Sequence, residues 1–152
     1  MDVLAFRGPG ETKVAHPGTH NAHPLSAAAG VATLGLLSDG EVQARVAARA
    51  AELRARLAEA IRTRGVPAVV YGTSSTFRLL LGSDRVDLET AKAGTPRALA
   101  DALNCGMLLR GVHLFHGDGF LSDAHTDADL ERIAQAFEWT LSRLQAEGLL
   151  AG

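Results

Sequence analysis

Near the end of the chain, apolar side chains recur every three or four residues, which predicts one long helix with a buried face. Thr126 is placed to cap this helix, and Asp127 and Asp129 suit its positive N-terminal end. The apolar stripe consists of Leu130, Ile133, Phe137, Leu141 and Leu144.

A second amphipathic helix is predicted to run to about Arg64. Ser38 and Glu41 form a capping-box pattern that stops the first helix and starts this one, and Gly65 ends it. Charged residues cover its other side, and such a face is typically solvated and carries no function. The buried stripe is predicted to be Val42, Val46, Leu53, Leu57 and Ile61.

A first helix is predicted to begin at Pro24, because the fixed φ of proline suits the first helical position. Its apolar positions are mostly alanine and glycine, which predicts close packing against a neighbouring element. The residues at helical spacing are Leu25, Ala28, Ala29, Ala32 and Leu36.

The segment between the two long helices alternates short apolar runs with turn residues, which is typical of strands. Thr95 and Pro96 are predicted to start one further helix, which carries Leu99, Leu103, Met107 and Leu108 inward and closes at Gly111. The sequence therefore predicts an α+β fold, a mainly antiparallel sheet with helices on one face, preceded by a long helical entry segment. Strands are predicted at 66–71, 76–81 and 112–115, with a fourth in or near 119–122.

The composition of the 152 residues excludes several classes of partner. A net charge of −2 gives no reason to expect nucleic acid or an anionic membrane. No stretch approaches the about 20 apolar residues of a membrane span, and no signal-peptide pattern opens the chain, so we expect a cytoplasmic protein. The single cysteine, Cys105, excludes an internal disulfide and is predicted to be a buried, inert thiol.

Gly18 and Thr19 lie a few residues before the proline that opens the first helix. Such an arrangement places a hydroxyl and free backbone N–H groups where an anion can sit. Taken alone, a glycine-threonine pair is more often an ordinary turn.

Other groups of reactive residues do not form a complete metal or catalytic site. His16, His20 and His23 have metal-like spacing, but the prolines and glycine among them disfavour a helix, and no metal site is predicted. His116 is placed where it could line a pocket, although a structural role is favoured for each histidine at the strand ends. A hydrolase is not favoured, because Ser74, Ser75 and Ser122 have no evident activating base.

Three stretches of the chain resemble, in the same order, parts of one known protein family. The chain resembles the C-terminal part of the class III, fold-type-I pyridoxal-phosphate aminotransferases, and the last stretch is most similar to the glutamate-1-semialdehyde aminomutase branch. The resemblance implies that 1–37 is a remnant of the large cofactor-binding domain with a linker helix. It implies that 38–152 is the C-terminal small α/β domain. The stretches are Gly18–Gly30, Gly72–Leu79, and a third in two parts, Leu108–Leu114 and Gly119–Leu130.

The resemblance also implies a role for the first stretch. Thr19 matches the family's threonine that binds the phosphate of pyridoxal 5'-phosphate, typically in the active site of the neighbouring subunit of a dimer. Gly18 lets the backbone approach that phosphate closely. The parent reaction moves an amino group between an amino acid or amino aldehyde and a keto partner.

The chain departs from the family where the chemistry is concentrated. Its only lysines are Lys13 and Lys92, and neither matches the family's Schiff-base lysine. No catalytic residue is therefore assigned, and we expect the chain alone not to transaminate. The expected partners are a missing N-terminal portion or a second copy, since an exposed apolar first helix favours self-association. The alternative is a non-catalytic oligomerisation or ligand-binding module built on the same fold.

A second departure concerns specificity. The segment from His113 to Asp118 lacks the Phe-Glu pair that aminomutases carry there, which favours a general aminotransferase. Asp118 is a candidate to replace that acid, but the pattern favours an aspartate in a surface turn.

Overall fold

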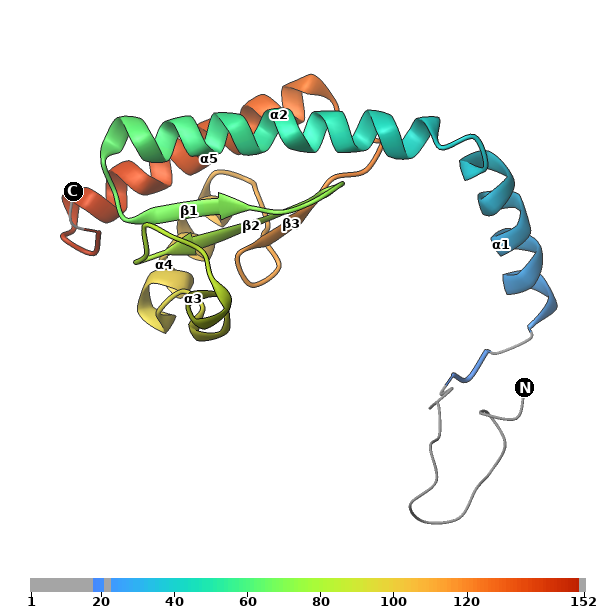
Figure 1. Cartoon of the computed structure of the whole chain (residues 1–152), viewed down its shortest axis with the longest axis horizontal. Coiled ribbons are helices and arrows are strands. Elements are labelled where there is room, and N and C mark those ends of the chain that lie inside the picture. Colours follow the sequence, from blue (N-terminus) through green and yellow to red (C-terminus); the bar gives the residue numbers. More distant parts are fainter. Residues whose placement is uncertain (1–17, 21–22, 151–152) are drawn as a thin grey trace, which may run out of the picture. The chain divides into compact units, whose positions relative to one another are not determined.

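The computed structural model describes residues 18–20 and 23–150 (Figure 1). Contacts along the backbone divide the chain into two units, Met1–Asp39 and Gly40–Gly152. The first unit holds the helix α1, and the second holds the sheet and the other helices. In chain order the elements are α1 (Pro24–Leu37), α2 (Glu41–Arg64), β1 (Ala68–Tyr71), β2 (Thr76–Leu81), α3 (Leu88–Ala93), α4 (Arg97–Leu109), β3 (Asp118–Phe120) and α5 (Asp127–Ala146).

The second unit is an α+β fold built on an antiparallel sheet with the strand order β1-β2-β3. Val70 lies opposite Leu79 and Phe77 lies opposite Gly119, so β2 is the central strand. Figure 1 shows α2 and α5 side by side above the sheet, and α2 contacts both β1 and β2. The α+β class and the antiparallel sheet are confirmed.

The core of this unit forms where the apolar stripes of α2 and α5 meet the sheet. Every residue of the predicted α5 stripe is buried, and so is the α2 stripe apart from the half-buried Val42. Phe137 and Leu53 are fully enclosed, at 0% exposure. The helix α4 packs along α5, where the Arg110 guanidinium lies 5.4 Å from the ring centroid of Trp139.

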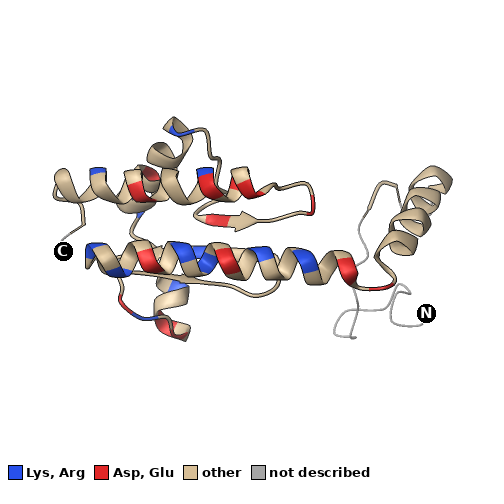
Figure 2. Cartoon of the chain, turned by 90° about the horizontal axis from the view of Figure 1, so that it is seen from above, with Lys and Arg blue, Asp and Glu red and all other residues tan. Residues whose placement is uncertain are grey.

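The helix α1 differs from these elements because none of its residues is buried. It carries no charged side chain, and in Figure 2 it has one uniform colour, whereas α2 has red and blue turns. The close packing predicted for its alanine-rich face does not occur within the described part of the chain. Among the described residues, no helix is both long enough and apolar enough to span a bilayer.

Two predicted helix caps are wrong, because each hydroxyl bonds elsewhere. Ser38 is the C-cap of α1, which ends there as predicted, but it does not start α2: its Oγ donates to the carbonyl of Gly35 at 2.9 Å, and Gly40, at φ 76°, is the N-cap of α2. Thr95 Oγ1 accepts the N–H of Leu81 at 3.1 Å and so ties the chain to β2, while Pro96 is the N-cap of α4.

Gly65, at φ 62°, ends α2 as predicted, and Thr126 caps α5 as predicted. The short helix α3 was not predicted. It is stabilised by a capping box in which the Asp87 carboxylate accepts the N–H of Thr90 at 2.8 Å.

The predicted strand at 112–115 is also wrong. The N–H of Val112 donates to the carbonyl of Met107 at 2.9 Å, so this segment completes the end of α4 instead of joining the sheet. Only Phe115 bridges to Asp118, across a tight turn in which His116 has φ 53° and Gly117 has φ 86°.

Two predicted burials on α4 are contradicted. Cys105 is exposed, and Leu108 is 60% exposed. The helix turns Gly106 toward α5, where a Cβ would lie 2.5 Å from Thr140 Cγ2. This close approach sets the buried face along Leu103 and Met107 and leaves the cysteine outside.

Candidate functional site

The predicted anion site lies just before α1. The N–H of His23 donates to the carbonyl of His20 at 3.1 Å, which closes a turn after Thr19. His23 is the N-cap of α1 and makes no side-chain capping bond. The first N–H groups of a helix have no partners within it, so they and the exposed Thr19 hydroxyl are donors of the kind that phosphate accepts.

The three predicted histidines of this region are only partly described, because His16 lies outside the described residues. The rings of His20 and His23 stand edge to face, with their centroids 5.7 Å apart. Within residues 18–20 and 23–150, no group of three metal-ligating side chains comes together.

A second polar cluster, not predicted from the sequence, lies on the sheet face that carries the β2 residue Arg78. The Nε and Nη2 atoms of Arg78 each lie 2.5 Å from a carboxylate oxygen of Asp118 on β3. Asp118 is only 17% exposed, so its prediction as a surface-turn aspartate is wrong. The hydrogen bonds that Arg78 donates to Asp118 and then to Tyr71 raise the pKa of Arg78 above its ordinary value.

A hollow of about 590 Å³ lies beside this ion pair. Its walls include Tyr71, Thr76 and the exposed ring of Phe120. Glycine is required at position 119 in its wall, because a Cβ there would lie 2.1 Å from the Phe77 ring. His116 lines a neighbouring cavity of about 260 Å³, which is the less favoured of the two roles considered from the sequence.

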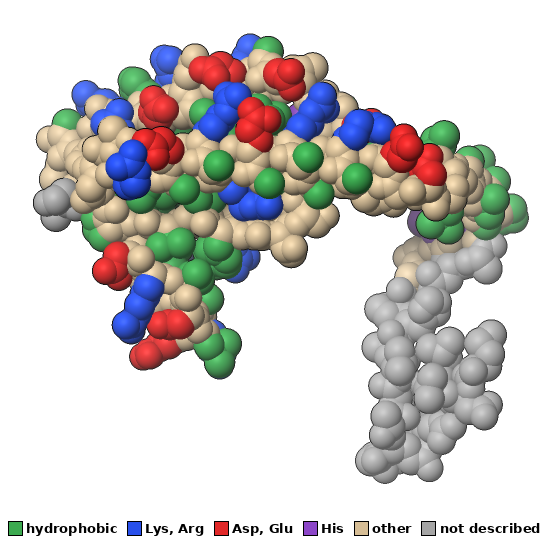
Figure 3. Space-filling view, turned by 45° about the horizontal axis from the view of Figure 1, so that its top comes forward, with side chains coloured by type: hydrophobic (Ala, Val, Ile, Leu, Met, Phe, Trp, Pro, Cys, Tyr) green, Lys and Arg blue, Asp and Glu red, His purple; other side chains and the backbone are tan. Residues whose placement is uncertain are grey.

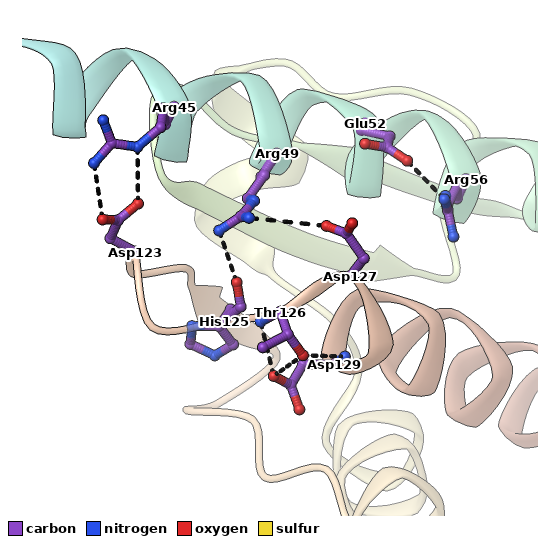
Figure 4. A network of polar contacts seen from close by, with 9 residues as sticks. All are labelled: Arg45, Arg49, Glu52, Arg56, Asp123, His125, Thr126, Asp127 and Asp129. Carbon is purple, nitrogen blue, oxygen red and sulfur yellow. Dashed lines mark hydrogen bonds and ion pairs between the residues drawn. The ribbon is translucent and has the colours of Figure 1, made fainter.

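Figure 4 shows how arginines of α2 hold the loop that leads into α5. Arg45 Nη2 lies 2.9 Å from a carboxylate oxygen of Asp123, and this bond lowers the pKa of that carboxyl. Arg49 Nη1 donates to the carbonyl of His125 at 2.9 Å. These contacts hold the loop in place and do not form an evident reactive group.

Ser122 does have a histidine neighbour, contrary to the sequence-based prediction. Its Oγ lies 3.0 Å from Nδ1 of His125. The same nitrogen accepts the backbone N–H of Ser122 at 3.0 Å. Since Nδ1 has one lone pair, it is not free to activate the hydroxyl as a base, and the pair stabilises the turn before α5.

Comparison with known proteins places the whole chain in context. No family model matches it. It is 33% identical over 157 residues to the glutamate-1-semialdehyde 2,1-aminomutase of Methanopyrus kandleri, covering 95% of this chain and 36% of that protein. It is 36% identical to the aminomutase of Syntrophus aciditrophicus, covering 95% of this chain and 33% of that protein. The chain thus spans about a third of the length of these curated relatives.

Solved structures give the same result. The β-phenylalanine aminotransferase of Variovorax paradoxus superposes with a TM-score of 0.77 at 29% identity, over 95% of this chain and 34% of that one. An omega-transaminase from Sphaerobacter thermophilus superposes with a TM-score of 0.74 at 26% identity, over 88% of this chain and 31% of that one. A transaminase solved with pyridoxal phosphate bound superposes with a TM-score of 0.71 at 27% identity, over 94% of this chain and 33% of that one.

The fold is therefore that of a segment of the transaminases. The chain belongs to the class III aminotransferase and glutamate-1-semialdehyde aminomutase family and corresponds to the C-terminal part of its members.

Proposed function

We propose that this chain is the C-terminal segment of a pyridoxal-phosphate-dependent class III aminotransferase or aminomutase-like protein that transfers an amino group. The observation that carries the proposal is the match to aminomutases over 95% of the chain, together with a TM-score of 0.77 to an aminotransferase. The substrates would be an amino acid or amino aldehyde and a keto partner.

Thr19 and Gly18 are the residues through which this segment would hold the cofactor. The phosphate of pyridoxal 5'-phosphate is a dianion, and a hydroxyl beside the open start of α1 matches it chemically. In the resembling enzymes this threonine typically reaches the neighbouring subunit. The proposal therefore puts the phosphate in a site that another subunit or the completing portion of the enzyme largely builds.

The residues of this chain fit the phosphate of the cofactor and not its reactive ring. When bound, the cofactor supplies an electron sink that needs a covalently linked lysine. Lys92 belongs to α3 in the second unit and is exposed, and Lys13 lies outside the described residues. The chain alone would therefore provide a phosphate contact without amino-group transfer.

The proposal is tested in two preparations. In the first, the isolated chain is mixed with pyridoxal phosphate and followed near about 400 nm, where a lysine-linked cofactor absorbs. No change from the absorbance of the free cofactor is expected. Covalent attachment with turnover by this chain alone would refute the proposed dependence on another lysine.

In the second preparation, this chain replaces the matching third of the Methanopyrus kandleri aminomutase to give a chimera. Thr19→Ala should weaken retention of the cofactor by about tenfold, because one charge-assisted hydrogen bond is lost. Thr19→Ser keeps the hydroxyl and should retain the cofactor like the parent chimera. Equal retention by all three would remove Thr19 from the site.

The second candidate is a non-catalytic ligand-binding module, favoured by the hollow of about 590 Å³ beside the Arg78–Asp118 pair. This reading predicts that the isolated chain binds a small molecule without pyridoxal phosphate. The test is a calorimetric screen of amino and keto acids against the parent chain and the Arg78→Lys variant. Binding by the parent that is lost in the variant would favour the ligand-binding module.

A further inference from the structure

A cavity of about 220 Å³ is lined by the loop after α4, by β2 and β3, and by the start of α5. Its apolar lining includes Phe77, Phe120 and Ile133, and its polar lining includes His125 and Arg132. The side chain of Phe120 is 61% exposed, so a molecule in the cavity would remove apolar surface from water. Apolar walls with a few polar groups are typical of sites for small molecules.

His125 offers the cavity a hydrogen-bond donor in a fixed tautomer. Its Nδ1 accepts the backbone N–H of Ser122 at 3.0 Å, so the neutral imidazole carries its proton on Nε2. Nε2 makes no hydrogen bond to any residue in 18–20 or 23–150. Arg49 holds the carbonyl of the same residue at 2.9 Å, and Figure 4 shows the imidazole pointing away from that arginine. The donor is therefore held in place before any ligand arrives.

Arg132 adds a positive charge that the described residues leave unpaired. Figure 3 shows basic and acidic side chains interspersed over α2, where Arg56 lies 2.6 Å from Glu52 and 2.9 Å from Glu131. In contrast, the guanidinium of Arg132 on α5 forms no hydrogen bond or ion pair with another described side chain. A guanidinium presents its donors in a fork that matches the two oxygens of a carboxylate.

One carboxylate, that of Asp129, also lines the cavity. Its Oδ2 accepts the backbone N–H of Thr126 at 2.8 Å and the hydroxyl at 2.7 Å, so it serves the start of α5. These bonds, followed by the nearby His125 and Arg132, lower the pKa of Asp129. With the imidazole of His113 as a further lining group, donors outnumber the remaining acceptors. The balance favours an anion over a cation.

We propose that this cavity binds a small organic monocarboxylate with a planar apolar body. Arg132 binds the carboxylate, the Nε2–H of His125 donates to it, and the ring of Phe120 packs against the body. The cavity is smaller than the about 300–1,000 Å³ of sites for drug-sized ligands, so the ligand is small. The inference goes beyond the proposed function, because the site uses residues of the second unit and needs no cofactor.

Benzoate is the probe for this site, since it joins one carboxylate to a planar ring. It should bind the full chain with a dissociation constant of about 1 mM or lower, which a ligand of this size can reach. Benzamide has the same ring without the charge, and benzylamine has the opposite charge. Both should bind at least about tenfold more weakly in calorimetry. Absence of benzoate binding, or tighter binding of benzylamine, would overturn the proposal.

Two arginine variants on the same helix test the charge. Arg132→Gln should weaken benzoate binding by at least about tenfold, because a charge-assisted hydrogen bond is lost. Arg143→Gln removes the same charge from α5 at a position that does not line the cavity, and it should bind benzoate like the parent. Equal weakening in the two variants would show that net charge alone attracts the anion, which would contradict the site.

His125→Asn separates binding from the role of this residue in the turn. The asparagine oxygen can replace Nδ1 as acceptor of the Ser122 N–H, but nothing replaces the Nε2–H. The variant should therefore keep the urea midpoint of the parent and bind benzoate about fivefold more weakly or worse. Parent-like binding at an unchanged midpoint would refute the contact to His125.

The amide signals in a nuclear magnetic resonance titration locate the ligand. Benzoate should shift the amides of 111–114 and of His125. Phe120 also lines the hollow beside the Arg78–Asp118 pair, so shifts confined to 71–78 and 118–120 would place benzoate there and overturn this proposal. The proposed cofactor contact is tested separately, because cofactor retention by the Thr19→Ala chimera does not involve this cavity.

Discussion

The helices α1 and α5 belong to one chain but depend on different surroundings. In α5, eight residues are buried, acidic residues begin the helix and a capping box closes its start. In α1 no residue is buried, no side chain caps the start, and neither end carries a charge that matches the helix dipole. The sequence of α5 therefore specifies contacts within the second unit, whereas the sequence of α1 specifies contacts that the described chain does not supply.

Truncating one apolar side chain on each helix should show the difference between α1 and α5 most clearly. Phe137→Ala removes a side chain with 0% exposure and should lower the free energy of unfolding of the second unit by about 3–5 kcal/mol. Leu34→Ala on α1, where the side chain is 69% exposed, should change it by less than about 0.5 kcal/mol. Urea unfolding of the isolated chain, followed by circular dichroism, measures both values. Similar losses in the two variants would contradict the contrast.

Gly106→Ala should have the next largest effect, because the new methyl group would lie 2.5 Å from Thr140 Cγ2. Overpacking of this kind costs about 1–3 kcal/mol of unfolding free energy. Thr140→Ser removes the methyl group, the nearer of the two clashing atoms, while the hydroxyl oxygen stays 2.8 Å from the new Cβ and still donates to the Ala136 carbonyl at 2.7 Å. The double variant should therefore lose less than the sum of the single losses, and strict additivity would count against the contact.

The smallest predicted effect is a pH dependence at the start of α5. Hydrogen bonds from the Thr126 backbone N–H and then its hydroxyl lower the pKa of Asp129. A carboxyl whose pKa is lower in the folded state stabilises the fold above its unfolded pKa of about 3.9, and this contribution disappears as the pH falls through the folded pKa.

Asp129→Asn should flatten the loss of stability below about pH 4, measured as the urea midpoint at successive pH values. Thr126→Ser retains the hydroxyl and should keep the acid dependence of the parent, whereas Thr126→Val should reduce it. A profile that is the same in all variants would remove this carboxyl from the acid response.

The long helices of the second unit could be predicted because their stripes repeat over many residues. The stripe from Leu130 to Leu144 is buried as predicted, and Thr126 caps it. Single hydroxyls were harder to assign, since Ser38 and Thr95 each have several backbone partners within reach. Only the packed structure decides that Ser38 bonds to Gly35 and Thr95 to β2.

The polar cluster on the sheet was not predictable because it depends on strand register. Arg78 and Asp118 are far apart in sequence and meet only because β3 pairs with β2. The run from Val112 to Phe115 has strand composition, but its first N–H bonds to the end of α4. At the proposed phosphate site, Gly18 and Thr19 were found through family resemblance, since a glycine-threonine pair alone is too common to indicate a ligand.

The placement of Trp139 has a practical consequence. It is the single tryptophan of the chain, and it lies against Arg110 where α4 meets α5. Its fluorescence emission therefore serves as an unlabelled optical reporter of that helix pair. Because α1 contains no aromatic residue, one spectrum can follow the melting of the second unit while the first stays silent.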